Sequence, residues 1–516
     1  MSRTSLRAAA PALAAALAAC AGPATGPAPM PGPATPTGTA ITAADLRHRM
    51  EIVAHDSMEG RDVGTPGIRK AADYLVAEMT RLGLRPAGDG GTWFNAVPLV
   101  RMRADADVSL GGRALGADVI VAVSGTGGLP ANTRQQAEGR LLYGGWIVDP
   151  SVPAAEELTP EQMRGGVLIL RMGVAPGAQP GQPRYNVGAL LGPGSPLAGV
   201  IMIAEGDLEQ FWAYAQGVAR NGSVSPPDTA APAAGALPTV FLTNPAGAER
   251  MIGRPLAQAT RPMADLGAFR YALRRTSSPI QAFNVVGVLP GADAARRGEY
   301  VAIGSHYDHD GIGQPVDGDS IYNGADDDGS GTVAMLEIAE RLVRQPPARS
   351  VLFVWHTAEE KGLLGSEAFT RTPTVPRESI VAQLNIDMIG RNTPDSVYLV
   401  GSRRLSTELG ELVEAVNRTQ ARPFAFDYSF DAPNHPERIY CRSDHYNYAR
   451  YGIPVTFFTT GLHDQYHKPQ DEAHLIDYDK LARVTQLIAD IGVEVANRPA
   501  RPRVDQPVPP LGTPCT

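Results

Sequence analysis

From about residue 281 onward, short apolar runs of the sequence alternate with helical patterns, and few folds accommodate such an alternation. Runs such as FNVVGVL, EYVAIGSH and SVLFVWHT have the length and composition of buried strands. Between them, apolar residues recur three or four positions apart, as in Met335, Ile338 and Leu342, which is typical of a helix packed on a sheet. We therefore predict an α/β fold, in which a mostly parallel sheet is sandwiched by helices.

The segment 131–272 has a different texture. It is rich in Gly, Pro and Ala and contains short β-like pieces such as RLLYGGWIV and GGVLILRM. A helical stripe over 67–82 precedes this segment, and the main alternation follows it. We predict that 131–272 is a small β-rich domain inserted into a larger domain made of 41–130 and 273–498, with a Pro-rich tail at 499–516.

The amino terminus has the pattern of a bacterial export signal. Arg3 and Arg7 precede an apolar stretch that is too short to span a membrane and that ends in Leu-Ala-Ala-Cys20. This ending resembles the lipoprotein cleavage box, in which the cysteine becomes the acylated first residue; an ordinary signal peptide with a chance cysteine is the alternative. We expect residues 1–20 to be a lipoprotein signal peptide and 21–40 a Pro/Ala/Gly linker. The protein would then be secreted across the inner membrane and lipid-anchored through Cys20, on the outer membrane facing the periplasm or the cell surface.

Charge and cysteine content exclude several classes of protein. The net charge is −8 and no run of Lys or Arg occurs, so nucleic acid is not an expected partner. The three cysteines are too few for a disulfide framework or a thiolate zinc site. Cys441 and Cys515 could form one disulfide if the carboxyl-terminal tail folds back.

Acidic and imidazole residues follow the strand-like runs directly. In open α/β sheets, ligands bind at the carboxyl ends of the strands, which makes these positions candidate site residues. They are His306 and Asp308 in SHYDH, Asp326, Asp327 and Asp328 in NGADDDGSG, Glu359 and Glu360 in TAEEKGLLGS, Asp387 in NIDMIG, and Tyr466, His467 and Asp471 in DQYHKPQD.

Singly, each motif has an ordinary structural explanation. Adjacent glutamates at a helix start complement the helix dipole, and the spacing of DDDGSG does not fit a calcium loop. Together, the motifs supply imidazoles and carboxylates without thiolates, which is a ligand set suited to zinc or another divalent cation. Burying so many carboxylates without a cation would be costly.

The motifs resemble those of the co-catalytic zinc aminopeptidases, a family that includes secreted bacterial leucyl aminopeptidases and, more distantly, glutamate carboxypeptidase and the transferrin receptor. The resemblance covers most of the chain. MEGRDVGTPGIRKAADYLVAEMTRLGL resembles the family's amino-terminal segment, and RSDHYNYARYGIP at 442–454 matches a further block. The segment 131–272 resembles the protease-associated domain that is common in the family.

The resemblance implies a site with two zinc ions. His306 and Asp387 would bind one ion, Glu360 and His467 the other, and Asp327 would bridge both. Asp327 corresponds to the bridging residue because the family places that residue two positions before the Gly of DDGSG. A cis peptide bond after Asp327 is implied as well.

The resemblance also assigns roles around the metals. Asp308 and Asp471 would orient the histidines. Glu359 resembles the family's general base, which takes the proton of a di-zinc-bound water and returns it to the leaving amine. Tyr466 and Arg442 resemble residues that contact the substrate carbonyl or its oxyanion, and a structural role for these two is an equal alternative.

The expected function is that of a metal-dependent exopeptidase, an aminopeptidase that hydrolyses the amino-terminal residue of peptides. Three alternatives stay open. A glutaminyl cyclase uses one zinc ion, which the full ligand set disfavours. A receptor that has lost catalysis is disfavoured by the presence of Glu359, and a carboxypeptidase would need an arginine cluster that the sequence does not show.

Overall fold

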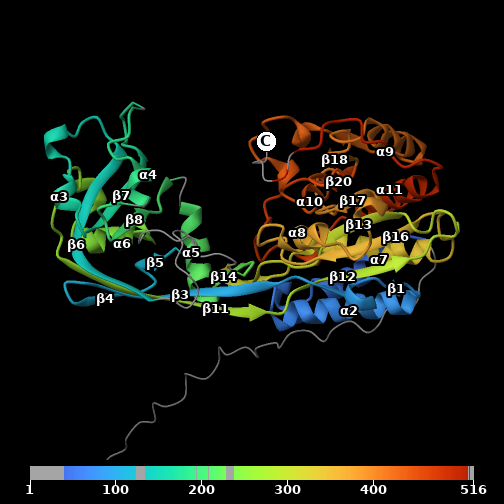
Figure 1. The fold of residues 1–516 in the computed structure, drawn as a ribbon, viewed down its shortest axis with the longest axis horizontal. Coiled ribbons are helices and arrows are strands. Elements are labelled where there is room, and N and C mark those ends of the chain that lie inside the picture. The colour runs from blue at the N-terminus through green and yellow to red at the C-terminus, as the bar shows by residue number, and fades with distance from the viewer. Residues whose placement is uncertain are drawn as a thin grey trace, which may run out of the picture.

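The computed structural model describes residues 40–123, 134–179, 181–192, 194–206, 209–227, 237–509 and 511. These residues form two lobes, each built around a nine-stranded sheet (Figure 1). The predicted signal peptide, nearly all of the predicted linker, Cys20 and Cys515 lie outside the described residues. None of the helices within these ranges has both the length and the apolar character that crossing a membrane requires.

The first sheet is mixed, with a group of parallel strands at its centre. In sheet order, its strands are β1 (Arg85–Pro86), β12 (Phe283–Leu289), β16 (Ser350–His356), β13 (Tyr300–His306), β17 (Ile380–Ile386), β20 (Val455–Thr459), β18 (Ser396–Val400) and β19 (Ala425–Asp427), with β2 (Phe94–Ala96) paired to β12. The four strands from β16 to β20 run parallel, whereas β12 and β18 pair antiparallel with the two outer members of this group. The predicted α/β fold is confirmed, and its parallel part is the centre, which helices cover on both faces.

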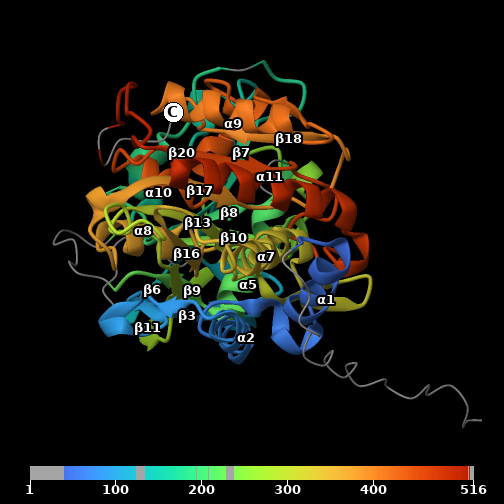
Figure 2. The ribbon, with the colours of Figure 1, turned by 90° about the vertical axis from the view of Figure 1, so that its right-hand side faces the viewer.

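Two groups of helices cover this sheet. One face carries α1 (Ala43–Val53), α2 (Pro66–Leu82), α7 (Gly331–Leu342), α9 (Thr407–Thr419) and α11 (Tyr478–Asn497); the other carries α8 (Leu364–Arg371) and α10 (His445–Ala449). Successive strand residues separate into two cores, since Val301 and Ile303 pack under the first group and Ala302 packs under the second. Figure 2 shows α1, α2, α7 and α11 gathered together.

The helix predicted over 67–82 is α2. Thr65 caps its amino end by accepting a hydrogen bond from a backbone N–H in the first turn, and Pro66 occupies the first position, where its missing N–H is harmless. Gly83 ends the helix in the left-handed conformation, with φ of 81°. The apolar stripe of the helix is buried, which fixes the amino-terminal segment against the first sheet.

The second lobe is a separate sheet with short helices. In sheet order, its strands are β4 (Arg113–Leu115), β3 (Leu99–Leu110), β11 (Ala268–Ile280), β6 (Arg134–Val148), β7 (Val167–Val174), β8 (Gly199–Ile203), β10 (Thr239–Thr243) and β5 (Ile120–Ala122), with β9 (Ser223–Ser225) paired to β3. Its helices are α3 (Pro160–Met163), α4 (Val187–Leu191), α5 (Glu209–Asn221) and α6 (Pro245–Ile252). It has its own apolar core, which supports an independent folding unit.

A long antiparallel ribbon joins the lobes. Strands β3 and β11 pair from Leu99 opposite Ile280 to Leu110 opposite Phe269, and they run from one lobe to the other (Figure 1). The second sheet also includes β4 and β5, which precede residue 131 in the chain. The domain boundaries at 131 and 272 stay a prediction. A small hairpin, β14 (Gly311–Val316) with β15 (Asp319–Tyr322), follows the carboxyl end of β13 and contacts α5 of the second lobe.

Candidate metal centre and active site

The five predicted metal ligands lie at the carboxyl edge of the first sheet. His306 is the last residue of β13, and Asp387 directly follows β17. Glu360 and His467 lie in the segments that follow β16 and β20, and Asp327 lies just before α7. Because these four strands are parallel, their carboxyl ends meet at one edge of the sheet. The structure therefore brings all five residues together.

Asp327 lies between the two histidines. Its Oδ1 is 3.2 Å from His306 Nε2, and its Oδ2 is 3.2 Å from His467 Nε2. Asp387 Oδ1 lies 3.6 Å from His306 Nε2, while Glu360 Oε2 lies 3.2 Å from His467 Nε2. The cluster thus has two ends joined by Asp327: a first end made by His306 and Asp387, and a second end made by Glu360 and His467.

The donor atoms of this cluster fit a divalent cation. Three groups of residues each have one ligand atom per residue within 4.8 Å of one another: His306 with Glu359 and Asp387, His306 with Asp327 and Glu360, and Asp310 with Glu360 and His467. Asp327 and Asp387 are 3% and 7% exposed, and burying adjacent carboxylates is very costly unless a cation balances them. Imidazole nitrogens and carboxylate oxygens are ligands that zinc takes in proteins, so the residues present fit zinc.

The two buried aspartates differ in their electrostatics. Burial opposes ionisation of Asp327, but hydrogen bonds with His306 and His467 overcome it and hold the pKa of Asp327 well below its usual value. At Asp387 burial dominates and raises the pKa. Asp327 is therefore the carboxylate that most readily stays ionised between the histidines, as a bridging ligand must.

The three consecutive aspartates have three different contacts. Asp328 accepts hydrogen bonds from the backbone N–H groups of Gly331 at 2.8 Å and of Met388 at 3.2 Å. Asp326 accepts one from the N–H of Gly390 at 2.6 Å. Their carboxylates thereby tie the loop before α7 to the end of β17, whereas the carboxylate of Asp327 contacts the rings of His306 and His467. The peptide bond between Asp327 and Asp328 is cis, as the family resemblance implied.

At the first end of the cluster, a backbone carbonyl lies against the ring of His306, and the hydroxyl of Ser443 donates to Asp387 Oδ2 at 2.6 Å. His306 Nδ1 lies 3.1 Å from the backbone oxygen of Asp308. The carboxylate of Asp308 instead accepts hydrogen bonds from the N–H groups of Glu359 and Glu360, at 3.1 and 3.4 Å. Asp308 therefore positions both the ring of His306 and the segment that carries the two glutamates.

The expected role of Asp471 is wrong, because a different residue lies beside His467. Asp471 accepts hydrogen bonds at 3.0 Å from the N–H groups of Asp326 and Asp327. Asp310 Oδ2 lies 3.2 Å from His467 Nδ1, so Asp310 is the carboxylate that orients this ring. Asp310 precedes the β14–β15 hairpin, a placement that only the folded chain reveals.

Glu359 and Glu360 point to different parts of the cluster although they are adjacent. At the first end, a carboxylate oxygen of Glu359 lies within 4.8 Å of ligand atoms of His306 and Asp387. Glu360 instead contacts His467, at the second end. Glu359 is 9% exposed, and burial raises its pKa well above the usual value. A carboxyl group in such a place can hold a proton that an exposed glutamate would release at neutral pH.

Tyr466 and Arg442 lie together at the cavity that contains the cluster. Arg442 Nη2 donates to Tyr466 Oη at 3.0 Å, and Arg442 Nη1 donates to Glu437 at 2.7 Å. The ring of Tyr466 lies 4.0 Å from that of His467, measured between centroids. The two residues therefore present a hydroxyl and a cation beside the second end.

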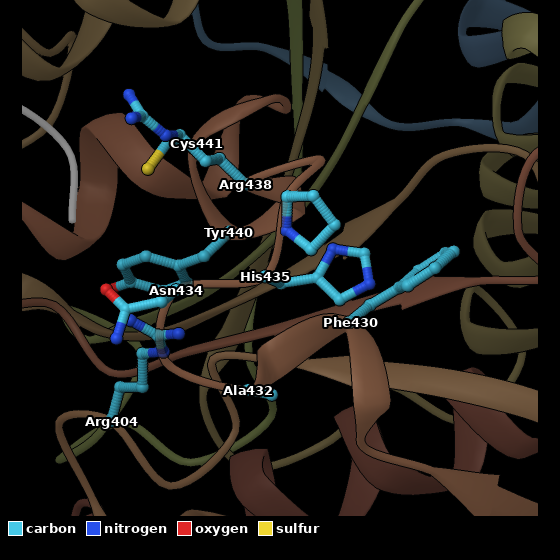
Figure 3. Close-up of a pocket in the computed structure, with 9 residues that line it drawn as sticks. Arg404, Phe430, Ala432, Asn434, His435, Arg438, Tyr440 and Cys441 are labelled. Atoms are coloured by element: carbon cyan, nitrogen blue, oxygen red, sulfur yellow. The ribbon is translucent and has the colours of Figure 1, made fainter. Parts of the chain in front are cut away.

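The same cavity has an apolar wall. Its apolar members are Met388, Phe430, Ile439, Phe457 and Leu462. Figure 3 shows a second cavity, of ≈ 260 Å³, whose lining includes Phe430. Phe430 also lines the first cavity, so the two adjoin at this residue. An amino-acid side chain that enters the first cavity would thus contact a wall that has empty space behind it.

The segment 428–442 separates the two cavities. Ile439 and Arg442 line the first, whereas Arg438 and Tyr440 line the second. Figure 3 shows Phe430 beside His435 in the second cavity, with 5.3 Å between the ring centroids. The segment is anchored next to these residues because Cys441 is disulfide-bonded, and Cys515, its expected partner, lies outside the described residues.

Two residues near the cluster were not recognised as part of the site from the sequence. His309 is fully buried, and its Nδ1 lies 2.7 Å from Glu360 Oε1. Asp310 contacts His467, as described above. Both directly follow the pair His306 and Asp308, so the signal was present in SHYDHDG, but strand position alone does not give side-chain contacts.

The part of the chain that carries the cluster is similar to known peptidases. Residues 284–492 match the model of peptidase family M28, a range that contains every residue of the cluster. Leucine aminopeptidase 1 of Aspergillus fumigatus is 28% identical over 261 residues, which is 47% of this chain and 63% of that protein. Leucine aminopeptidase 1 of Uncinocarpus reesii is 27% identical over 260 residues, covering 47% and 62%. The chain therefore spans less than two thirds of the length of these relatives.

Solved structures share the fold over both lobes. A zinc aminopeptidase from Bacillus subtilis matches with a TM-score of 0.55 at 17% identity, covering 92% of this chain and 100% of that one. An aminopeptidase from Aneurinibacillus sp. strain AM-1 matches with a TM-score of 0.54 at 16% identity, covering 91% and 97%. The two-lobed arrangement is thus found in other proteins of very different sequence.

Proposed function

We propose that the protein is a zinc-dependent aminopeptidase of peptidase family M28 and that it hydrolyses the amino-terminal residue of peptides. The match of residues 284–492 to the model of that family supports the proposal. One observation carries the proposal: a full set of imidazole and carboxylate ligands meets in one cavity, with the additional carboxyl group of Glu359 beside it. The similarity to leucine aminopeptidases supports cleavage at the amino-terminal end of the substrate.

We infer that two zinc ions bind here. His306 and Asp387 would hold one ion, Glu360 and His467 the other, and Asp327 would lie between them, in agreement with its contacts to both histidines. When bound, such a pair of ions supplies Lewis acidity that polarises the scissile carbonyl and acidifies the attacking water.

The residues of the chain would move the proton. Glu359, buried beside the first end, is placed to accept a proton from the attacking water and to return it to the leaving amine. The raised pKa that burial imposes favours this return, because the group can carry the proton between the two steps.

Tyr466 and Arg442 would stabilise the reaction's negative charge. Hydrogen-bond donors directed at a developing oxyanion lower the barrier because they are already oriented before the reaction. Arg442 holds the Tyr466 hydroxyl at 3.0 Å, so the two act as one preorganised unit. The free amine of the substrate would be recognised by the acidic groups beside the metals.

The function is tested with purified mature protein. We expect close to two zinc ions per chain, loss of activity with a chelator and recovery on adding zinc. Chromogenic amino-acid amides with a free amine should be cleaved, and the same amides with a blocked amine should not. Release of carboxyl-terminal residues from amino-blocked peptides, or cyclisation of amino-terminal glutamine with one zinc ion, would contradict the aminopeptidase assignment.

We also propose a location and a role for the rest of the chain. The lipoprotein-like ending at Cys20 supports a lipid anchor on the outer membrane, with the linker as a tether, and the segment 131–272 would be a protease-associated domain. Substituting Cys20→Ser should release the protein from membranes on detergent partitioning while the activity of the soluble part stays the same. Retention of that variant in the membrane fraction would rule out this anchor.

A further inference from the structure

The carboxylate of Glu360 is held from two sides. Its Oε1 lies 2.7 Å from His309 Nδ1, and its Oε2 lies 3.2 Å from His467 Nε2. A carboxylate that binds a metal is ionised and only accepts hydrogen bonds, so His309 Nδ1 would be the donor to Glu360 when the metal is bound. One oxygen is thus occupied by a protein donor, and the other is turned towards the second end of the cluster.

The ring of His309 is fixed in place by its surroundings. The residue is fully buried, and its backbone N–H donates to the carbonyl of Arg61 at 3.3 Å. Gly324 packs directly on the ring, since a Cβ at that position would lie 2.5 Å from the ring carbon Cγ. The orientation of the imidazole therefore comes from packing and would hold whether or not Glu360 moves.

Arg61 secures both segments that surround this ring. Its buried guanidinium donates to the carbonyls of Tyr307, Asn323 and Gly324, at 2.9, 2.6 and 2.9 Å. These carbonyls lie on the two stretches of chain that flank His309. The amino-terminal segment of the chain thus supports the position of His309 from outside the metal cluster.

His309 does not act as a ligand in this arrangement. None of the potential ligand groups found among the described residues includes it. Its Nε2 is buried without a hydrogen-bond partner there, so the only polar contact of the ring is the one to Glu360. Because the single polar contact of this buried imidazole is made to a predicted metal ligand, we look for its role in the orientation of that ligand.

We propose that His309 is a positioning residue, which holds one carboxylate oxygen of Glu360 so that Glu360 binds the metal through the other oxygen alone. The proposal rests on the proposed zinc site. Groups that orient a metal ligand typically change metal affinity by about 10- to 100-fold when they are lost. Without this donor, the Glu360 carboxylate is free to rotate, and the ion at the second end is held less tightly.

The test uses zinc affinity rather than turnover. Metal-free full-length protein is titrated with zinc in competition with a chromophoric chelator, for the wild type and for His309→Ala, His309→Asn and His309→Gln. The Asn amide nitrogen reproduces a donor near the Nδ1 position, whereas the Gln amide reaches the Nε2 position instead. His445→Asn is the matched control, because His445 is equally buried and makes no contact with a predicted ligand.

We expect His309→Ala to weaken one of the two ions by about 10- to 100-fold and to leave the other unchanged. His309→Asn should recover most of the lost zinc affinity. His309→Gln should be as weak as His309→Ala, and the control His445→Asn should bind zinc like the wild type. The cobalt-substituted protein gives a second readout, because a change in the number of bound oxygens alters its visible absorption. Far-UV circular dichroism and the melting temperature of the metal-free forms show whether a variant is folded.

Several results would overturn the proposal. The first is an unchanged zinc affinity in His309→Ala, and the second is an equal loss of affinity for both ions in that variant. The third is the same zinc affinity in His309→Asn and His309→Gln. The comparison of His309→Asn with His309→Gln remains informative even if His309→Ala fails to fold, since the two amide side chains fill similar space. A wild type that binds no zinc pair or cleaves no peptide would instead refute the proposed function, so the two failures are distinguishable.

Discussion

The two ends of the metal cluster are built differently. His306 and Asp387 stand at the ends of β13 and β17, and their side chains are 1% and 10% exposed. His467 lies in a loop with a left-handed backbone, φ of 53°, and its side chain is 35% exposed. The first end is thus held by buried strands, whereas the second end opens towards solvent at His467, although the Glu360 side chain is only 4% exposed. A ligand that lacks support from a strand needs side-chain partners to orient it, which explains why His309 and Asp310 lie at the second end.

This contrast suggests a division of work within the site. The buried end provides a rigid base, where the carbonyl of Asp308 orients His306 and the hydroxyl of Ser443 orients Asp387. The open end lies beside Tyr466 and Arg442 and has room for an incoming substrate. Substitutions of His309 and Asp310 should therefore perturb the second end more than the first.

The largest expected effect comes from the adjacent glutamates, which contact different ends. Glu359→Gln keeps the size of the side chain but removes its ability to accept a proton, so kcat should fall by roughly 10² to 10⁴-fold with normal zinc content. Glu360→Gln replaces an anionic ligand by an amide, so it should loosen one ion, with partial recovery of activity in excess zinc. Metal analysis and steady-state kinetics of both variants check this, and each variant serves as the control for the other. Loss of zinc in Glu359→Gln together with full occupancy in Glu360→Gln would show that the roles are reversed.

The second prediction concerns the carboxylate that orients His467. Asp310→Asn removes the negative charge 3.2 Å from His467 Nδ1, so zinc affinity at the second end should fall by roughly 10- to 100-fold. Competitive zinc titration measures the effect. Asp319→Asn is the matched control, because Asp319 lies in the neighbouring hairpin and bonds only locally. Equal weakening of both ions by Asp310→Asn would contradict the different construction of the two ends.

The sequence was informative where function depends on position along a strand. An apolar run followed by an acidic or imidazole residue predicts a side chain at the carboxyl edge of a parallel sheet, and the five candidate ligands do meet there. Their roles as zinc ligands, and that of Glu359 as base, stay predictions. The choice of Asp327 within its triplet needed the family resemblance, because three consecutive aspartates look alike until the fold directs Asp326 and Asp328 to backbone N–H groups.

Contacts between distant side chains could not be predicted in this way. The family resemblance implied that Asp471 would orient one of the histidines, yet its carboxylate accepts a hydrogen bond from the loop before α7, 144 residues away. The pairing of β3 with β11 was equally hidden. In RADADV of β3, Ala104, Ala106 and Val108 do pack on the core of the second lobe, but the alternation within one strand does not identify the strand that pairs with it. Such features depend on which surfaces pack together, which the local pattern of one segment does not contain.

The smallest expected effect lies at the wall of the cavity, which belongs to neither end of the cluster. Phe430 lines both the metal-containing cavity and the second cavity of ≈ 260 Å³, and its ring is stacked on Tyr398 with 4.2 Å between centroids. Phe430→Ala would join the two spaces, so the ratio of kcat/KM for large over small amino-terminal side chains should rise by about tenfold, the scale of discrimination that an apolar pocket provides. Zinc affinity and the kcat for a small substrate should change little, because Phe430 contacts no predicted ligand.

A panel of amino-acid amides with side chains of increasing size measures this shift. Tyr428→Ala is the control, since Tyr428 lies in the same segment, is 38% exposed and lines neither cavity. A matching shift in Tyr428→Ala would assign the effect to general loosening of 428–442 and not to the shared wall. If Phe430→Ala instead loses zinc, the wall and the second end are coupled through Ile439 and Arg442, and the open end would then depend on this segment as well as on His309 and Asp310. An unchanged ratio with normal zinc content would mean that substrate side chains do not reach Phe430, and that selectivity is set by Met388, which follows β17, and by Phe457 of β20.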